Sequence, residues 1–178
     1  MNQTNTPDLV SAGGLGLGTK LPVILQAEAS ECGLACLAMI AGFYGFETDL
    51  NQLRRRFSMS MHGVNLKQLR DMATRMHLNG RALQLEMEHL KDLQLPCILH
   101  WDMKHFVVLK KVTGSKVIIH DPAIGERVLS KSEVGRSFTG VALELTPAPS
   151  FVKGEIKQSL TLSHFWTRII GLKRSLIL

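Results

Sequence analysis

The pattern of apolar residues changes near residue 80, and this change limits the folds open to the chain. Before it, apolar residues recur at helical spacing in three segments: 32–41, 50–57 and 66–72. After it, turn signals separate six short β-like runs: 81–85, 96–101, 106–112, 117–120, 127–129 and 141–145. A helical half followed by an antiparallel half predicts an α+β fold, in which helices pack on one sheet.

Polar residues mark the expected ends of the helices. Ser30, Asp49 and Asn65 stand just before the three periodic segments, where their side chains can accept a hydrogen bond from a backbone N–H of the first turn. We therefore expect these three residues to be N-caps. Asn79 and Gly80 form a turn-favouring pair, which predicts that the helical half closes there.

The chain has 178 residues, 45% of them hydrophobic, which is enough for one buried core. We expect a flexible, glycine-rich segment at 1–20, a folded domain at 21–147, and a linker with an amphipathic segment at 148–178. The last segment mixes aromatic, apolar and basic side chains, which suits a membrane interface and predicts that it leads towards a transmembrane domain not included in this sequence. An amphipathic helix docked on the domain or on a partner fits that composition equally well.

Cysteine usage and charge narrow the class of protein. The three cysteines form no CxxC pair and no secretory signal precedes them, so we expect a reducing, cytoplasmic setting without disulfides. No further Cys or His pair has zinc spacing, so we expect no metal and no other cofactor. The net charge of +6 favours anionic partners, but no nucleic-acid motif is recognisable, which disfavours nucleic acid. The basic run 54–56 is expected to be a solvated helix face.

Cys32 is the residue best placed for chemistry. It stands in the first turn of the predicted helix 32–41, where unpaired backbone N–H groups favour a thiolate and can bind an oxyanion. Gln26, six residues earlier, fits a second oxyanion donor because its amide donates a hydrogen bond without carrying charge. Each residue alone also fits an ordinary role, a core cysteine or a surface glutamine. Cys36 and Cys97 are expected to be inert core cysteines.

His105 and Asp121 can complete this site. His105 opens one β-run and Asp121 follows another, so antiparallel pairing brings both to the same end of the sheet. A three-residue loop at 113–115 would place their side chains on one face as diagonal neighbours, whereas a two-residue loop would send them to opposite faces. We predict the three-residue loop, with Asp121 orienting the imidazole that activates the cysteine. His100 and His120 are the alternative histidines.

Together these residues resemble the N-terminal peptidase domain of peptidase-containing ABC exporters, which mature and secrete bacteriocins. The resemblance covers about 21–145 and rests on four motifs: Gln26-x-Glu28-x-x-Glu31-Cys32-Gly33-Leu34-Ala35-Cys36-Leu37, Leu95-Pro96-Cys97-Ile98-Leu99-His100-Trp101, His105-Phe106-Val107-Val108-Leu109 and Asp121-Pro122. It implies a papain-like cysteine peptidase, with the nucleophile at a helix N-terminus packed on a C-terminal antiparallel sheet. Cys32 would be the nucleophile, His105 the general acid/base, Asp121 the orienting residue and Gln26 the oxyanion donor.

The resemblance also implies a substrate and a setting. Such domains remove double-glycine leader peptides from bacteriocin precursors on the cytoplasmic side of the bacterial inner membrane, coupled to export. The partners would be the leader peptide and the transmembrane and ATPase domains of the same exporter, which as a full-length protein would be a homodimer. The chain departs from papain in a shorter separation between the Cys and the His and in using Asp for Asn, so only the wider fold and the roles transfer.

The residues leave two other functions open. A peptide-docking module of an exporter would bind its ligand without cleaving it, and selective alkylation of Cys32 at mildly acidic pH would argue against that function. An acyltransferase or deamidase would use the same three residues on another substrate, and the mass of its product would distinguish it from a peptidase.

Overall fold

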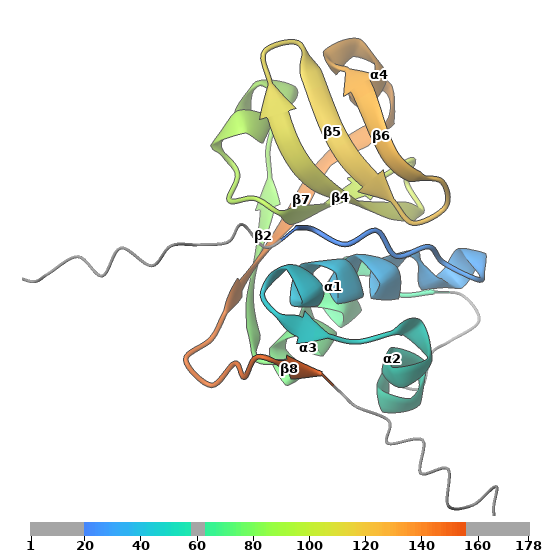
Figure 1. Cartoon of the computed structure of the whole chain (residues 1–178). Helices are drawn as coiled ribbons and strands as arrows, with labels where there is room; N and C mark the ends of the chain where they lie inside the picture. Colours follow the sequence, from blue (N-terminus) through green and yellow to red (C-terminus); the bar gives the residue numbers. More distant parts are fainter. Residues whose placement is uncertain (1–19, 58–62, 156–178) are drawn as a thin grey trace, which may run out of the picture.

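The computed structural model describes residues 20–57 and 63–155. In this part of the chain, a six-stranded antiparallel sheet carries helices on both of its faces (Figure 1). The arrangement is α+β, as the sequence predicts. Residues 1–19 of the expected flexible segment at 1–20, and most of the expected linker and amphipathic segment at 148–178, lie outside the described residues, so both stay predictions.

The described residues form helices and strands with the following bounds. The helices are η1 (Ala29–Glu31), α1 (Cys32–Phe43), α2 (Leu50–Phe57), α3 (Leu66–Arg75), η2 (Met87–Asp92) and α4 (Lys131–Ser137), where η marks a 3-10 helix. The strands are β1 (Phe46–Glu47), β2 (Leu78–Gln84), β3 (Cys97–Trp101), β4 (His105–Thr113), β5 (Lys116–Asp121), β6 (Gly125–Ser130), β7 (Phe138–Pro147) and β8 (Gly154–Glu155). Within the described ranges, no helix combines the length and apolarity needed to cross a membrane.

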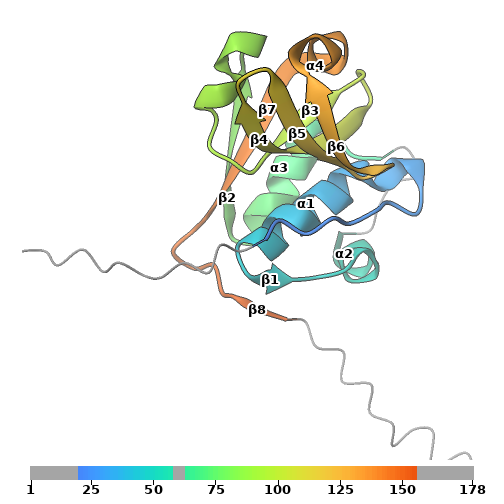
Figure 2. The same ribbon diagram turned by 45° about the horizontal axis from the view of Figure 1, so that its top comes forward.

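The large sheet separates two hydrophobic cores. Its strand order is β2-β7-β3-β4-β5-β6, and every neighbouring pair is antiparallel, while β1 and β8 form a small parallel pair. Successive side chains of a strand point to opposite faces. Ile98 of β3 accordingly packs with α1, whereas Cys97 and Leu99 pack with Val134 of α4. Figure 2 shows the same division from a second direction, with α1, α2 and α3 below the sheet and α4 above it.

Helix α1 is the centre of the larger core. All residues from Cys32 to Ala41 are buried, because the helix is apolar on every side and is surrounded by the sheet, by α2 and α3 and by the segment 20–26. At its start, Gly33 allows close packing: a Cβ there would lie 2.5 Å from Cγ2 of Val64 and 3.6 Å from Cδ2 of Phe106. The first turn of α1 is therefore held against the beginning of β4.

Two of the three predicted N-caps are confirmed. Asp49 and Asn65 each accept a hydrogen bond from the backbone N–H three residues further on, at 2.8 and 2.9 Å. The prediction for Ser30 was wrong, because this residue lies within η1 and Glu31 directly precedes α1. The helix thus begins at the nucleophile candidate itself, but it is reached through a 3-10 turn rather than through a serine cap.

The helical half ends earlier than predicted. Helix α3 ends at Arg75, and His77 then turns the chain with a φ of 60°, in the left-handed region. Asn79 and Gly80 do not form a turn but lie inside β2, paired with β7. The glycine is needed there for close packing, since a Cβ on Gly80 would lie 2.7 Å from Cγ of Arg70.

All six predicted β-runs are strands of the large sheet, and all three predicted helical segments are helices. The sequence did not predict η2 and α4. Helix α4 has seven residues with one buried side chain, Val134, so it carries too little apolar periodicity to be recognised.

The hairpin between β4 and β5 places His105 and Asp121 on one face of the sheet, as predicted, but through a shorter loop and a β-bulge. Thr113 pairs with Lys116, so the loop has two residues, Gly114 and Ser115, and not the three that were predicted. A β-bulge lies between Leu109 and Lys111, and beyond it Val108 pairs with His120. The extra residue shifts the register by one, which restores residue 107 to the place opposite Asp121. His105 and Asp121 therefore share one face of the sheet.

Candidate active site

Cys32 is the first residue of α1 and is 5% exposed, so its side chain is almost enclosed at the start of the helix. The N-terminus of an α-helix carries a partial positive charge and N–H groups that can bind an anion. Cys36 lies one turn further along α1 and Cys97 lies in β3, and both are fully buried. Both lie in the core as predicted, and burial raises the pKa of both thiols, which is consistent with the expectation that they are inert.

His105 and Asp121 form a hydrogen-bonded pair at one end of the sheet. His105 is the first residue of β4 and Asp121 the last residue of β5, and His105 Nε2 donates to Asp121 Oδ1 at 2.8 Å. Oδ1 also accepts the backbone N–H of Ala123 at 2.9 Å, and Oδ2 accepts a longer contact from Arg127 Nη1 at 3.4 Å. Asp121 is only 3% exposed. Its carboxylate is held by hydrogen bonds from its own turn and from the two neighbouring strands.

The imidazole of His105 connects this carboxylate with the cysteine. Burial lowers the pKa of His105, but hydrogen bonds to Asp121 and to Cys32 outweigh it and raise the pKa to about 9. Since Nε2 bonds Asp121, the nitrogen left for Cys32 is Nδ1. Burial raises the pKa of Asp121, but the bonds from His105 and Ala123 hold it below its usual range overall. At neutral pH this geometry favours an imidazolium between two acidic groups.

Gln26 reaches the same site from the segment that precedes η1. Its backbone N–H donates to the carbonyl of Pro122 at 2.9 Å, directly after Asp121. Its side-chain Oε1 is buried and has no hydrogen-bond partner among the described residues. Rotation of the amide by 180° exchanges Oε1 and Nε2, so the same buried position can offer an N–H donor. An unsatisfied buried amide is what a site that awaits a polar ligand would contain.

Glu31, directly before the cysteine, is 3% exposed and is strongly hydrogen-bonded. Its Oε2 accepts the backbone N–H groups of Ala27 at 2.9 Å and Glu28 at 3.0 Å, and its Oε1 accepts Nε of Arg54 from α2. The hydrogen bond from Arg54 is the main cause of the lowered pKa of Glu31. Within the expected solvated face at 54–56, Arg55 and Arg56 are exposed, whereas the side chain of Arg54 is 36% exposed and also pairs with Glu31.

The alternative histidines occupy other positions. His100 Nδ1 lies 2.8 Å from Thr139 Oγ1, and His120 is buried, with its ring nitrogens bonded to the carbonyl of Pro22 and to Glu126. Neither is placed between a cysteine and a carboxylate. In residues 20–57 and 63–155 no cluster of three or more His, Cys, Asp or Glu side chains could hold a metal ion.

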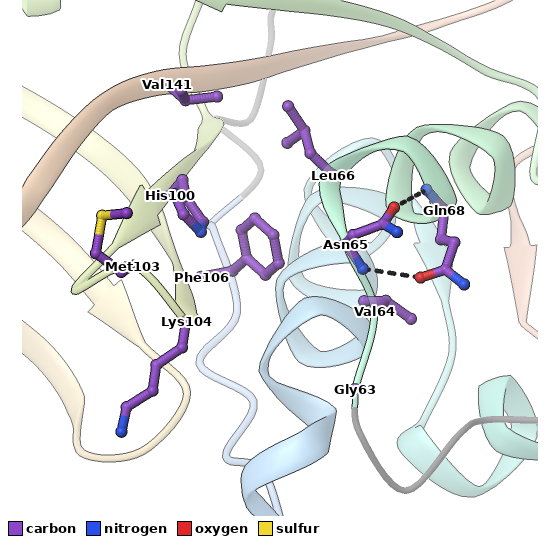
Figure 3. Close-up of a pocket in the computed structure, with 10 residues that line it drawn as sticks. All are labelled: Gly63, Val64, Asn65, Leu66, Gln68, His100, Met103, Lys104, Phe106 and Val141. Atoms are coloured by element: carbon purple, nitrogen blue, oxygen red, sulfur yellow. Dashed lines mark hydrogen bonds between the residues drawn. The ribbon is translucent and has the colours of Figure 1, made fainter.

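A cavity of about 670 Å³ opens beside these residues, between the start of α3 and the loop that joins β3 to β4 (Figure 3). Its lining includes Val64, Leu66, Phe106 and Val141, with His100 as a polar group on the same wall. Figure 3 shows the ring of Phe106 between His100 and the loop before α3. Phe106 follows His105 in β4, and the site for a Cβ on Gly33 lies close to both Val64 and Phe106, so the cavity adjoins the start of α1.

Sequence reasoning located the four predicted site residues but not their support. Arg127 contacts Asp121, and Glu31 accepts a hydrogen bond from the segment beside Gln26. Arg127 is one of several polar residues in a strand and Glu31 a charged residue in a turn, so the sequence pattern does not predict these contacts. Glu31 lies within the family-like motif, but a motif alone does not say that its carboxylate points back to residues 27 and 28. The cavity was missed because residues 63–68, 100–106 and 141 are far apart in the sequence.

Comparison with known proteins agrees with this geometry. The model of the peptidase C39 family matches residues 20–150. The chain is 42% identical to the colicin V secretion/processing ATP-binding protein CvaB of Escherichia coli over 99% of its length, which is 25% of that protein. It is 45% identical to the probable microcin-H47 secretion/processing ATP-binding protein MchF of E. coli over 88% of its length, which is 22% of that protein. The chain therefore spans about a quarter of the length of these curated relatives.

Solved structures show the same fold. The crystal structure of a double glycine motif protease from an AMS/PCAT transporter, in complex with the leader peptide, is 40% identical, with a TM-score of 0.68 over 73% of this chain and 94% of that one. The peptidase domain of Streptococcus ComA is 24% identical, with a TM-score of 0.66 over 72% of this chain and 99% of that one. The α+β arrangement is thus the papain-like fold that the sequence predicts.

Proposed function

This chain belongs to the peptidase C39 family and is a cysteine peptidase domain, and from that premise we propose that Cys32, His105, Asp121 and Gln26 are its catalytic machinery and that it cleaves leader peptides after a Gly-Gly pair. The observation that carries the assignment is the position of His105. Its Nε2 bonds Asp121 Oδ1 at 2.8 Å, and interaction with Cys32, at the start of a buried helix, contributes to its raised pKa, so the other ring nitrogen is the one available to the thiol.

Acylation begins with transfer of the Cys32 proton to His105, whose raised pKa favours the imidazolium form of the ring. The sulfur of Cys32 attacks the carbonyl carbon of the second glycine, so a C–S bond forms and the carbonyl electrons move to oxygen. The oxyanion accepts hydrogen bonds from the first turn of α1 and from the Gln26 amide. When the C–N bond breaks, the His105 imidazolium gives its proton to the departing amine, and the leader remains as a thioester on the sulfur.

Deacylation reverses the role of the histidine. His105, now neutral, takes a proton from the attacking water, whose oxygen bonds to the thioester carbonyl carbon. The C–S bond then breaks, and the leader leaves as a carboxylic acid that loses its remaining proton to solvent, while the sulfur and the protonated ring of His105 are ready for the next cycle. Asp121 keeps the ring oriented through both steps, because its carboxylate stays bonded to Nε2 and stabilises each imidazolium that forms.

The cavity beside the site suits the leader segment that precedes the cut. Its lining combines apolar side chains with polar ones from Asn65, Gln68, His100 and Lys104, and it adjoins Gly33, where a larger residue would clash with Val64. An extended or helical peptide with apolar side chains can bury them there. The relative with a solved complex binds a leader peptide and is named for the double glycine motif, which supports the same substrate class here.

The relatives also suggest the setting. They are secretion and processing ATP-binding proteins for colicin V and microcin H47, so we infer a bacteriocin precursor, of the colicin V kind, as the substrate. The domain would act on the cytoplasmic side of the bacterial inner membrane, joined to transmembrane and ATPase domains of a homodimeric exporter. No cofactor is needed for the steps above, because the thiol, the imidazole and water supply all the groups that react.

The test is incubation of the chain with a synthetic bacteriocin precursor that carries a Gly-Gly leader, followed by mass analysis. We expect one cut, after the second glycine, and none with Cys32→Ala. The matched control is Cys36→Ala, which removes a fully buried thiol one helical turn away and should retain cleavage. Replacement of the second glycine by leucine in the substrate should abolish the cut.

Other outcomes would point elsewhere. A precursor that binds but stays intact would indicate a docking module. A product whose mass shows transfer of the acyl group to an amine, or loss of a side-chain amide, would indicate a transferase or a deamidase. Cleavage that survives in Cys32→Ala would refute the assignment of the nucleophile.

A further inference from the structure

We propose that Glu31 is a positioning residue for catalysis: its carboxylate holds the turn that aims the Gln26 side chain at the oxyanion. The proposal rests on the proposed role of Gln26 as oxyanion donor. Glu31 itself would not touch the substrate, and would act through the backbone of residues 27 and 28.

The first step is the set of bonds that fix this turn. Three consecutive backbone N–H groups, those of residues 26 to 28, each donate a hydrogen bond to a group elsewhere in the site. Gln26 donates to the carbonyl of Pro122 at 2.9 Å, and Ala27 and Glu28 both donate to Oε2 of Glu31, at 2.9 and 3.0 Å. With these three bonds formed, the backbone on both sides of the Gln26 side chain has little freedom. Hydrogen bonds to a charged acceptor are stronger than neutral ones, so Glu31 is the dominant restraint on residues 27 and 28.

The second step is the reason why Glu31 stays charged and in place. The residue is 3% exposed, and a buried carboxylate is costly unless it is paired and hydrogen-bonded. Arg54 supplies the pairing, since its Nε donates to Oε1, and Asn51 in turn accepts Nη1 of Arg54 at 2.7 Å. One oxygen thus binds the arginine while the other binds the turn. Helix α2 is thereby connected to the segment that carries Gln26.

The third step is the position of Glu31 in the chain. It directly precedes Cys32, so its own backbone is continuous with the first turn of α1, which we propose as the other half of the oxyanion site. The side chain points back along the chain to residues 27 and 28. Glu31 therefore sets the separation between two sources of oxyanion donors. A displacement of about 1 Å in such a site can cost about 10²-fold in rate.

The fourth step is a control that separates a role in catalysis from the capping of a helix start, which Glu31 also performs at η1. Glu133 makes the same kind of contact at the start of α4, where its Oε2 accepts the backbone N–H of Ser130 at 2.7 Å. Glu133 lies in an exposed helix on the opposite face of the sheet, so it provides a matched control. Glu133→Ala removes a capping bond of the same type from an exposed position, whereas Glu31→Ala removes two such bonds and an arginine pair beside the proposed site.

The experiment has two readouts, and the first needs no substrate. Amide hydrogen exchange is measured for the native chain, Glu31→Ala and Glu133→Ala. We expect exchange at Ala27 and Glu28 to become about tenfold faster or more in Glu31→Ala, because the charged acceptor is lost. Glu133→Ala should leave both amides unchanged. Unchanged exchange in Glu31→Ala would overturn the proposal whatever the substrate is.

The second readout is the kinetics of cleavage of the double-glycine precursor. Glu31→Ala should lower kcat by about 10²-fold with little change in KM. Combined with Gln26→Ala, it should cause little further loss, because both changes remove the same donor. Glu31→Gln should recover part of kcat, since an amide oxygen can still accept from residues 27 and 28. Losses that multiply in the double variant would overturn the proposal.

The two levels of inference fail in different ways. If Gln26→Ala leaves kcat unchanged, the assignment of the oxyanion donor fails and this proposal fails with it. If Gln26→Ala is impaired but Glu31→Ala is not, only the proposal for Glu31 fails. If Glu31→Ala does not fold, Arg54→Gln replaces it: this variant keeps the bonds to residues 27 and 28 but loses the pairing, and should lower kcat in the same direction by a smaller factor. A normal kcat in Arg54→Gln would refute the idea.

Discussion

Replacing Asp121 by alanine should lower the pKa of His105, and the structure gives the size of the effect. Burial alone lowers this pKa, and hydrogen bonds to Asp121 and Cys32 raise it to about 9. The contact with Asp121 is 2.8 Å long, and the two side chains are only 19% and 4% exposed, so water screens it little. A hydrogen bond between charged groups contributes about 1.5–3 kcal/mol, which corresponds to about 1–2 pKa units. We therefore expect a pKa of about 7–8 in Asp121→Ala.

The pKa can be measured directly by NMR titration of the ring nitrogens of labelled histidine, with His105→Gln to assign the signal. The pH dependence of cleavage should follow the pKa of His105, because the imidazolium protonates the departing amine. The alkaline limb of kcat/KM should lie near pH 9 in the native chain and at lower pH in Asp121→Ala. Asp121→Asn keeps an oxygen acceptor and should fall between the two. The control is Asp92→Ala, which breaks an exposed carboxylate–histidine contact of 3.3 Å and should not move the limb.

Two results would refute this reasoning. A native midpoint near the ordinary histidine value of about 6.5 would mean that the imidazolium is not stabilised in the site. An unchanged midpoint in Asp121→Ala would mean that the carboxylate orients the ring but does not stabilise its charge.

The same shift predicts how stability depends on pH. The folded pKa of His105 lies above the unfolded value, so this proton stabilises the fold fully below about pH 6.5 and that contribution is lost as the pH rises towards 9. The melting temperature of the native chain should therefore fall across this window. In Asp121→Ala the fall should be smaller, and an equal fall in both would show that another group releases the proton.

Further predictions concern packing and the thiols. Gly33→Ala places a methyl group 2.5 Å from Cγ2 of Val64, a residue that lines the cavity. Displacement of Val64 should raise KM for the precursor more than it lowers kcat. An unchanged KM would mean that the leader binds elsewhere. Iodoacetamide at neutral pH should label Cys32 in the native chain, while Cys36 and Cys97, both fully buried and with pKa values raised by burial, should react only after unfolding; equal labelling of all three by mass spectrometry would contradict the assignment of the nucleophile.

Local signals predicted most of the fold, because apolar periodicity reports directly on which face of an element is buried. Asp49 and Asn65 could be recognised as caps because a cap needs only its own helix. Ser30 was misjudged because the chain enters α1 through a 3-10 turn, which its sequence does not distinguish from a capped start. Gly80 was misjudged for a non-local reason: the glycine makes room for Arg70 of α3 and does not turn the chain.

The hairpin shows where sequence reasoning reaches its limit. The side chains of His105 and Asp121 share a face only if an odd number of residues between them lies outside the ladder. A three-residue loop satisfies this condition, and so does a two-residue loop with one bulged residue, which is what forms. The sequence could therefore indicate that the two residues meet without indicating how. The bulge leaves both Leu109 and Val112 packed in the core on the α4 side of the sheet, and that packing depends on residues distant in sequence.

The turn after β5 connects the four proposed catalytic residues, Gln26, Cys32, His105 and Asp121, which come from three parts of the chain. Asp121 orients His105 through Oδ1, and the same oxygen accepts the N–H of Ala123, which fixes the turn. The carbonyl of Pro122, between them, accepts the backbone N–H of Gln26. One short turn thus positions both the proposed acid/base and the backbone of the proposed oxyanion donor. A change that distorts this turn should impair proton transfer and oxyanion binding together, whereas loss of the bonds from Glu31 should impair oxyanion binding alone and leave the pKa of His105 near 9.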